Sequence, residues 1–284
     1  MAGSIRIKKG NPWIDTYRFR DFFVLLMTFI SQNIFQAAVF FYTASSIPAI
    51  MRQKKVALFF LGIGLAANLS ACLGRYYHAW PMLPLYTGMY LLPLCIGVIL
   101  FLTNLKNKQW TTMLPLLICL LSLVALFFPK DYYLPFLMSS TIFSYIFFVS
   151  GIIGRSFFFI AAIKALQALI AARKRGKGNN PVPDAGTAGW VIWGFVFWTI
   201  SMFAGGIWSY LGWGSPVVWE DPAITTTMAT WFYYTCFLHL YLRRVWNLNK
   251  RLIFASTGGI LVFVLNCYPE LGIFRIPDLT WLIL

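Results

Sequence analysis

Eight stretches of this sequence run for 18 to 35 residues without a single Asp, Glu, Lys or Arg. They lie at 22–51, 56–74, 76–105, 109–129, 132–154, 185–219, 222–242 and 252–269. A helix needs about 20 apolar residues to cross the hydrocarbon core of a bilayer. The chain is 60% hydrophobic and only 11% charged, more apolar surface than a soluble fold of 284 residues could bury. The sequence therefore predicts an all-α polytopic membrane protein.

The net charge of +15 indicates membrane topology rather than nucleic-acid binding. Cytoplasmic loops are enriched in Lys and Arg. Four of the breaks between the apolar stretches are rich in Lys and Arg, and we call them the four basic breaks. If these breaks lie in the cytoplasm, the chain has eight transmembrane helices and both termini are extracytoplasmic, in a bacterial-type cytoplasmic (inner) membrane. No compact basic face carries base-stacking aromatics, so the expected partner is the lipid bilayer and no nucleic acid. Thirteen of the 23 basic residues lie in the four breaks: Arg52, Lys54, Lys55, Lys106, Lys108, Arg173, Lys174, Arg175, Lys177, Arg243, Arg244, Lys250 and Arg251.

The chain divides into five regions on this interpretation. They are a basic N-terminal arm (1–21), transmembrane helices 1–5 (22–175), a cytoplasmic linker loop (176–187), a tryptophan-rich region with flanking helices (188–245), and the last transmembrane helix with an extracytoplasmic tail (246–284). The arm carries five basic residues that by themselves favour the cytoplasm, but the 13 in the four breaks outnumber them. The five cysteines form no CxxC or CxxCH pattern, which excludes a thioredoxin-like motif, a zinc ribbon and covalent c-type haem.

Tryptophan is concentrated in the region 190–246, which holds eight of the twelve. Trp208 and Trp213 precede a predicted outer loop that continues through Trp219 to the adjacent acids Glu220 and Asp221. Flat apolar side chains beside polar groups suit a large planar hydrophobic ligand. On the preceding helix, six residues at helical spacing share a face: Trp190, Trp193, Phe197, Ser201, Ala204 and Trp208.

Two further polar residues fall inside predicted spans. His239 lies about 27 Å along the helix from Asp221, toward its cytoplasmic end. An imidazole in hydrocarbon needs a partner, either a hydrogen bond within a packed core or a metal such as haem iron. Arg155 lies about 18 Å beyond the start of the fifth crossing at Phe143. It is either an intramembrane arginine, paired or functional, or a residue that another helix register places at the cytoplasmic interface.

The spacing of these residues resembles a known family. Trp208 and Trp213 are five residues apart, Asp221 and Trp231 ten, and Asp221 and His239 eighteen. This pattern is similar to the tryptophan-rich "WWD" domain of cytochrome c assembly proteins, and more narrowly to the CcsA/ResC-type membrane subunit of the System II cytochrome c synthase. The similarity covers about 188–245, and the predicted topology extends it to the rest of the chain.

The resemblance implies a haem-handling role in cytochrome c biogenesis, within a cytochrome c haem lyase or synthase if the complex is an enzyme. Haem b would be bound non-covalently, with His239 as an axial ligand in the membrane. The external loop would present haem to apocytochrome c, and a membrane partner subunit would supply the opposing ligand. On this hypothesis Glu220 and Asp221 would orient the haem edge or organise the loop, and Arg155 or Arg75 would pair with a propionate. The stacking surface would consist of Trp208, Trp213, Trp219 and Trp231.

Two histidines of that family are absent from this chain. The family's external ligands fall where this sequence has 139–145 and 266–270, neither of which contains a histidine. His78 is the remaining histidine, and it is either an external axial ligand or an interfacial residue hydrogen bonded among aromatics. Another chain, a Met or a Tyr would otherwise complete the site, or the chain is a paralogue with a different use for haem.

A second function therefore stays open. The chain could be a structural or electron-transfer subunit of a respiratory membrane complex that binds haem, a quinone or no cofactor. Its basic arm would then dock an acidic partner such as another c-type cytochrome. A transporter is disfavoured by the lack of inverted repeats and the few intramembrane charges. Hydrolytic catalysis is unsupported, because no nucleophile–base set or phosphate loop is present.

Overall fold

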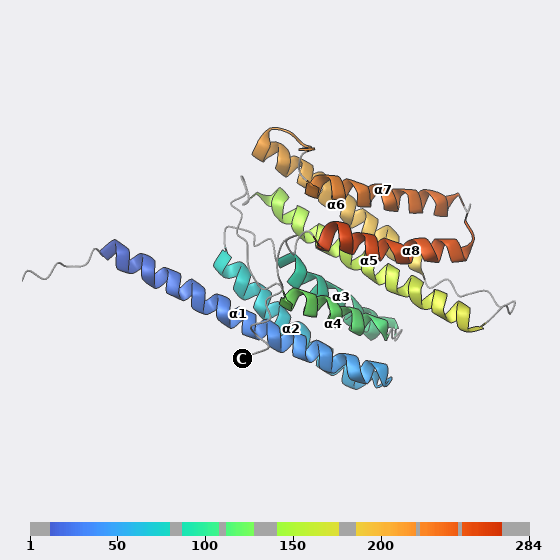
Figure 1. The fold of residues 1–284 in the computed structure, drawn as a ribbon, viewed down its shortest axis with the longest axis horizontal. Coiled ribbons are helices and arrows are strands. Elements are labelled where there is room, and N and C mark those ends of the chain that lie inside the picture. The colour runs from blue at the N-terminus through green and yellow to red at the C-terminus, as the bar shows by residue number, and fades with distance from the viewer. Residues whose placement is uncertain are drawn as a thin grey trace, which may run out of the picture.

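The structure, a computed structural model, describes the backbone of 12–79, 87–107, 112–127, 141–175, 186–219, 222–243 and 246–268, and the side chains of 30–77, 88–104, 112–127, 141–173, 186–219, 224–243 and 246–268. Within these ranges every regular element is a helix, which confirms the all-α prediction (Figure 1). The elements are α1 (Pro12–Ile50), α2 (Lys54–Ala79), α3 (Thr87–Asn107), α4 (Met113–Phe127), α5 (Ile142–Arg175), α6 (Thr187–Trp213), α7 (Pro222–Leu242), α8 (Leu248–Val262) and the π-helical turn η1 (Phe263–Cys267).

Four stretches of the described chain are long and apolar enough to cross a membrane: Lys54–Tyr77, Ile142–Arg173, Thr187–Trp213 and Leu248–Cys267. Shorter apolar helices cover Gly88–Asn104 and Met113–Phe127. The protein is thus a multi-pass helical membrane protein.

Successive helices run in alternating directions, so the bundle has two distinct ends (Figure 1). The last turns of α1, α3, α5 and α7 lie at one end of the bundle, and the four basic breaks follow these helices in the sequence. We call this the basic end. At the opposite end α6 finishes in Trp213, and we call it the tryptophan-rich end. The side of the membrane that each end faces stays a prediction.

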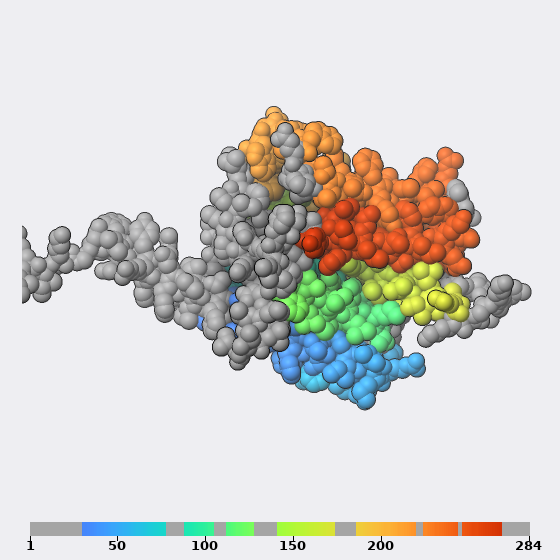
Figure 2. Space-filling view, viewed as in Figure 1, coloured from blue at the N-terminus to red at the C-terminus, as the bar shows by residue number. Residues whose placement is uncertain are grey.

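The helices form two groups. Helices α1–α4 contact one another, as do α5–α8, and the groups meet where α3 and α4 contact α5. Figure 2 shows the same division on the surface, with the first group below and the second above. Helix α5 is therefore central, because it contacts α6 and α8 in its own group as well as the first group.

Small residues allow α5 and α6 to cross closely. A Cβ added at Gly154 would lie 3.1 Å from both the Gly194 carbonyl oxygen and the Trp198 amide nitrogen. A Cβ at Gly194 would in turn lie 2.6 Å from the ring of Phe158. Small residues at membrane helix interfaces let the backbones approach and pack, since lipid tails give no hydrophobic drive between helices. These glycines therefore set the separation of α5 and α6.

The first group has a buried polar core. The fully buried amide of Asn68 donates from Nδ2 to the Tyr42 hydroxyl at 3.1 Å and to the Tyr90 carbonyl at 3.1 Å. The guanidinium of Arg75 lies 4.0 Å from the centre of the Tyr90 ring, in cation–π geometry. Asn68 thus joins α1, α2 and α3 by hydrogen bonds that water cannot replace inside a membrane.

Candidate functional site

The C-terminal end of α6 is closed by a tight turn. Gly214 adopts the left-handed conformation (φ 73°) that favours glycine, and its N–H donates to the Tyr210 carbonyl at 2.9 Å. The Ser209 hydroxyl donates to the Ser215 carbonyl at 2.7 Å, and the Ser215 hydroxyl donates to the Val217 carbonyl at 2.9 Å. These bonds fold the start of the tryptophan-rich loop back onto the end of the helix.

The three tryptophans at this end have different environments. Trp208 is only 7% exposed and packs its ring against Phe147 and Phe148 of α5, at centroid distances of 5.8 and 6.2 Å. Trp213 touches Trp208 edge-on at 6.0 Å but is 48% exposed, and Trp219 is 69% exposed. The surface open to a ligand here is therefore made by Trp213 and Trp219, while Trp208 supports it from beneath.

The six-residue face predicted on α6 packs against α5 along most of its length. Phe197 stacks on Phe157 of α5 with a centroid distance of 5.8 Å and an interplanar angle of 7°. The Ser201 hydroxyl donates to the Phe147 carbonyl at 2.7 Å. A Cβ at Gly205 would lie 2.8 Å from the Phe147 ring, so the small residues there admit a neighbouring helix. Trp193, at the edge of this face, is exposed.

Two indole groups link α6 to α7 in opposite directions. Trp198 of α6 donates from Nε1 to the Thr227 carbonyl of α7 at 3.2 Å. Trp231 of α7 donates from Nε1 to the Thr199 hydroxyl of α6 at 3.1 Å, and its ring lies 5.6 Å from that of Phe195. Trp231 is therefore held in the helix interface. Trp198 belongs to no pattern that the sequence singled out, because an interface tryptophan and an interfacial-belt tryptophan look alike in sequence.

His239 lies on a continuous exposed face of α7. Exposed positions recur along this helix at intervals of three and four residues, which places them on one side of it. Phe232, at 64% exposure, and His239 are among them. Within the described part of the chain the imidazole of His239 has no hydrogen-bond partner. We call this face the outward stripe of α7; it comprises Thr225, Ala229, Phe232, Cys236, His239 and Arg243.

Arg155 is buried inside the second group of helices, at 7% exposure. Its Nη1 donates to the Asn266 carbonyl in η1 at 3.3 Å, and its Nε donates to the Gly151 carbonyl at 3.4 Å. The Asn266 side chain then donates from Nδ2 to the Thr230 hydroxyl of α7 at 2.7 Å. The side chain thus lies within the bundle and is bonded to the end of η1, while its depth in a membrane stays a prediction.

Several residues singled out in the sequence cannot be placed. Glu220 and Asp221 lie outside the described residues. His78 falls in the last turn of α2, but its side chain is not among those described. Across the part of the chain that is described, no group of three or more His, Cys, Asp or Glu side chains could hold a metal ion.

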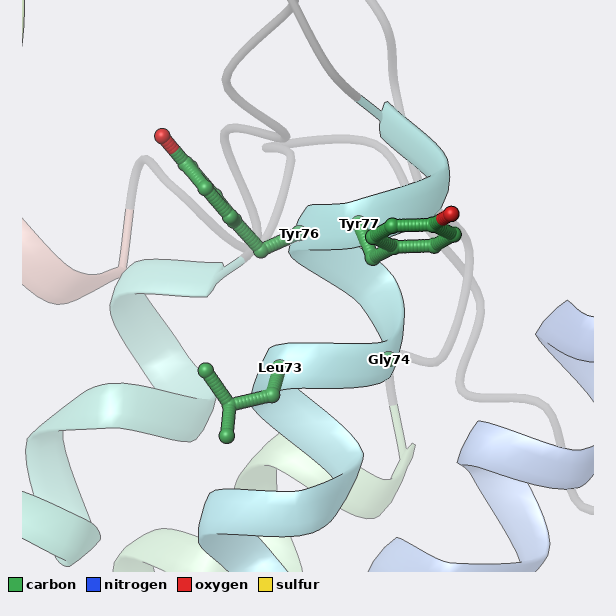
Figure 3. A pocket seen from close by; sticks show the side chains of 4 residues that line it. All are labelled: Leu73, Gly74, Tyr76 and Tyr77. Atoms are coloured by element: carbon green, nitrogen blue, oxygen red, sulfur yellow. The ribbon is translucent and has the colours of Figure 1, made fainter.

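A cavity of about 470 Å³ opens at the tryptophan-rich end of α2 (Figure 3). It is lined by Leu73, Gly74, Tyr76 and Tyr77, and its lining is almost entirely apolar. Tyr76 and Leu73 project from one side of the helix and Tyr77 from another, where it is largely exposed. The sequence does not predict this cavity, because a pair of adjacent tyrosines does not indicate a hollow beside them.

Comparison with known proteins agrees with this arrangement. The family described as cytochrome C assembly protein matches residues 82–268, more than half of the chain. Cytochrome c biogenesis protein CcsA of Nostoc punctiforme is 37% identical over 75 residues, which make up 26% of this chain and 20% of that protein. CcsA of Welwitschia mirabilis is 35% identical over 86 residues, 30% of this chain and 27% of that protein. The aligned part thus spans about a quarter of the length of these relatives.

A solved structure titled cytochrome c haem lyase CcmF has a similar fold. The likeness has a TM-score of 0.57 at 17% sequence identity and covers 95% of this chain and 50% of that one. At that identity it shows the fold alone. Because the family match extends from before α3 to the end of η1, it includes the α6–α7 turn, the outward stripe of α7 and Arg155. The chain therefore belongs to the cytochrome c assembly protein family, with a segment related to CcsA.

Proposed function

We propose that the protein handles haem b in cytochrome c maturation, with His239 as an axial ligand within the membrane. The observation that carries the proposal is the exposed imidazole on the outward stripe of α7. A polar ring facing lipid is costly, so a membrane histidine on an outer face is expected to meet a partner or a ligand. Family membership makes haem the expected ligand.

The residues present on the outward stripe of α7 fit a haem ligand. An imidazole nitrogen is a common axial ligand of haem iron, and His239 has no hydrogen bond within the described chain that would compete for it. Phe232 offers a flat apolar side chain about two turns along the same stripe. Haem would be the cargo here, and its vinyl groups would supply the sites for thioether bonds in a c-type cytochrome.

The second axial ligand of this site comes, in this proposal, from a membrane partner subunit. Toward the tryptophan-rich end the outward stripe carries the small side chains of Ala229 and Thr225, which would let another transmembrane helix lie close. A partner helix packed there would cover the imidazole and complete the coordination. This explains why a polar side chain lies on an outer face of the chain alone.

The tryptophan-rich end would present haem to apocytochrome c on the extracytoplasmic side of a bacterial-type cytoplasmic membrane. Trp213 and Trp219 supply exposed aromatic surface for a planar macrocycle. Trp208 would hold that surface against α5. The last turn of α2 carries His78 at this end, but its side chain is not among those described, and we assign no axial ligand there to this chain.

The test is a reduced-minus-oxidised visible spectrum of the full chain, purified in mild detergent after expression with its membrane partner. We expect a haem b signal that His239→Ala removes. Ser70→Ala is the control, because Ser70 is an exposed polar residue of α2 that bonds only within its own helix and should leave the signal intact. A colourless wild-type protein, or a signal that survives His239→Ala, would refute the assignment.

The alternative is a haem- or quinone-binding subunit of a respiratory membrane complex. One observation favours it: the stretches 139–145 and 266–270 lack the histidines expected from the family resemblance. A haem-binding respiratory subunit would also give the spectrum above, so haem transfer separates the two functions. If co-expressed apocytochrome c gains covalent haem only in the presence of the wild-type protein, the maturation role stands; if it never does, the respiratory role is favoured.

A further inference from the structure

We propose that Arg155 is a positioning residue: acting through Asn266 and Thr230, it holds α7 in the orientation that turns His239 outward. The inference rests on the proposed function for its ligand, since it concerns the presentation of the same imidazole. It assigns Arg155 to the support of that residue, whereas the hypothesis from the sequence has Arg155 or Arg75 pair with a haem propionate.

The contacts form one unbroken polar chain across three elements. Arg155 of α5 donates to the backbone carbonyl of Asn266, and the Asn266 side chain donates to the Thr230 hydroxyl on α7. That hydroxyl donates to the Thr226 carbonyl one turn earlier on α7. Asn266, Arg155 and Thr230 are all buried, so water does not compete for these bonds.

The end of η1 explains why a guanidinium is needed there. The last four carbonyls of a helix have no partner within the helix, and the carbonyl end carries partial negative charge. Asn266 is the second-last residue of η1, so its carbonyl is one of these groups. Arg155 is directed to it from α5, where a cation both donates a hydrogen bond and neutralises the helix end. With its backbone fixed in this way, the Asn266 side chain points from a defined place toward α7.

Thr230 and His239 occupy opposite sides of α7. They are nine residues apart, which is about 2.5 helical turns and about 13.5 Å along the axis. Thr230 is fully buried, whereas His239 is exposed. An anchor on the inner side therefore controls the direction of the imidazole on the outer side, because any rotation of α7 moves both by the same angle.

Apolar packing also contributes to the placement of α7. Tyr234 is fully buried and stacks on Phe158 of α5 at a centroid distance of 3.6 Å, and Phe237 is buried one turn further along. Flat rings tolerate small sliding and rotation, whereas the 2.7 Å bond from Asn266 to Thr230 requires one distance and one direction. The polar chain should thus be what makes the orientation unique.

The experiment compares Thr230→Val, Arg155→Met and the double variant in the full chain with its membrane partner. Thr230→Val keeps the shape of the side chain and replaces only the hydroxyl, with a methyl group that cannot form hydrogen bonds. Thr257→Val is the matched control, because Thr257 also pairs across α7 and α8, with Tyr233, whose hydroxyl keeps its bond to the Phe254 carbonyl. We expect each of the first two variants to weaken haem binding by about tenfold, the lower end for residues that orient a metal ligand.

The double variant shows whether Arg155 and Thr230 act through the same chain of hydrogen bonds or independently. Because both residues act through one chain, the double variant should bind haem no more weakly than the poorer single variant. The haem affinity of the Thr257→Val control should stay within about twofold of the wild-type affinity, the usual error of such comparisons. Additive losses in the double variant, or wild-type affinity in Thr230→Val, would overturn the proposal.

A haem-free measurement keeps this result separate from the proposed function. A spin label at Cys236, with the other four cysteines replaced, reports how openly that face of α7 meets lipid through its accessibility to oxygen. We expect accessibility to fall in both Thr230→Val and Arg155→Met but not in Thr257→Val. If haem is absent from the wild type, the proposed function fails while this measurement still decides the positioning role. Unchanged accessibility in all variants would reject that role.

Discussion

Replacing Gly154 with Ala should destabilise the protein, because the new methyl group would meet backbone atoms that cannot rotate away. Its Cβ would lie 3.1 Å from two backbone atoms of α6 and 3.4 Å from a third. Comfortable contact between such atoms begins near ~3.5 Å, so α5 and α6 would have to separate by about 0.4 Å. Overpacking of this kind costs about 1–3 kcal/mol, and the higher helix propensity of Ala returns up to ~1 kcal/mol. The expected net loss is about 1–2 kcal/mol.

Gly189→Ala is the matched control in the partner helix. A Cβ at Gly189 would have no heavy atom within 4 Å, so the same substitution there should be neutral or stabilising by up to ~1 kcal/mol. The assay is reversible unfolding in mixed detergent micelles, followed by tryptophan fluorescence. If Gly154→Ala is as stable as Gly189→Ala, the close crossing of α5 and α6 is not what holds the second group together.

Three further expectations follow from the contacts described. Trp208→Ala should cost about 3 kcal/mol, the usual loss for a buried large side chain, whereas Trp219→Ala should change stability by less than about 0.5 kcal/mol, as measured by the same unfolding assay. If both are neutral, Trp208 does not support the turn. Thr199→Val and Trp231→Phe should show a coupling of about 0.6 kcal/mol in a double-mutant cycle, the average for hydrogen bonds between membrane helices, and additive losses would contradict the indole link. Asn68→Ala should cost about 1–3 kcal/mol by leaving two buried acceptors without their donor, and a thermal midpoint equal to that of the wild type would count against the polar core of the first group.

The number and approximate extent of the helices follow from the sequence, because hydrocarbon excludes charged side chains. Seven of the eight charge-free stretches contain most of one helix, and α7 has the predicted bounds of 222–242. The stretch 132–154 contains only the first part of α5, because that helix continues past Arg155 and Lys164. The beginning of α1 differs: its span is predicted from residue 22, yet the helix begins at Pro12. Charges determine where a segment can enter lipid, but they do not stop a helix. Proline is well tolerated in the first turn, where its missing N–H has no bond to lose.

The candidate site is less accessible to sequence reasoning, because exposure depends on neighbours from other segments. Trp208 and Trp219 look equivalent in the sequence, but Phe147 and Phe148 bury only Trp208. The sequence does not indicate a partner for Arg155, whose guanidinium lies beside a carbonyl of η1. The π-helical turn itself leaves no signature in residues 263–267, since these residues would also form an ordinary helix.

The placement of α5 has a consequence for how the membrane domain is assembled during synthesis. The most hydrophilic internal segment, 176–187, separates α5 from α6, yet α5 packs tightly on α6 and α8. The first four helices have one another as partners once they are inserted, whereas α5 has only α3 and α4 beside it until α6 and α8, its main partners, have been inserted. A gene divided between α4 and α5 should thus yield two polypeptides that insert separately and recombine, while division between α5 and α6 would separate the closest pair of helices in the second group.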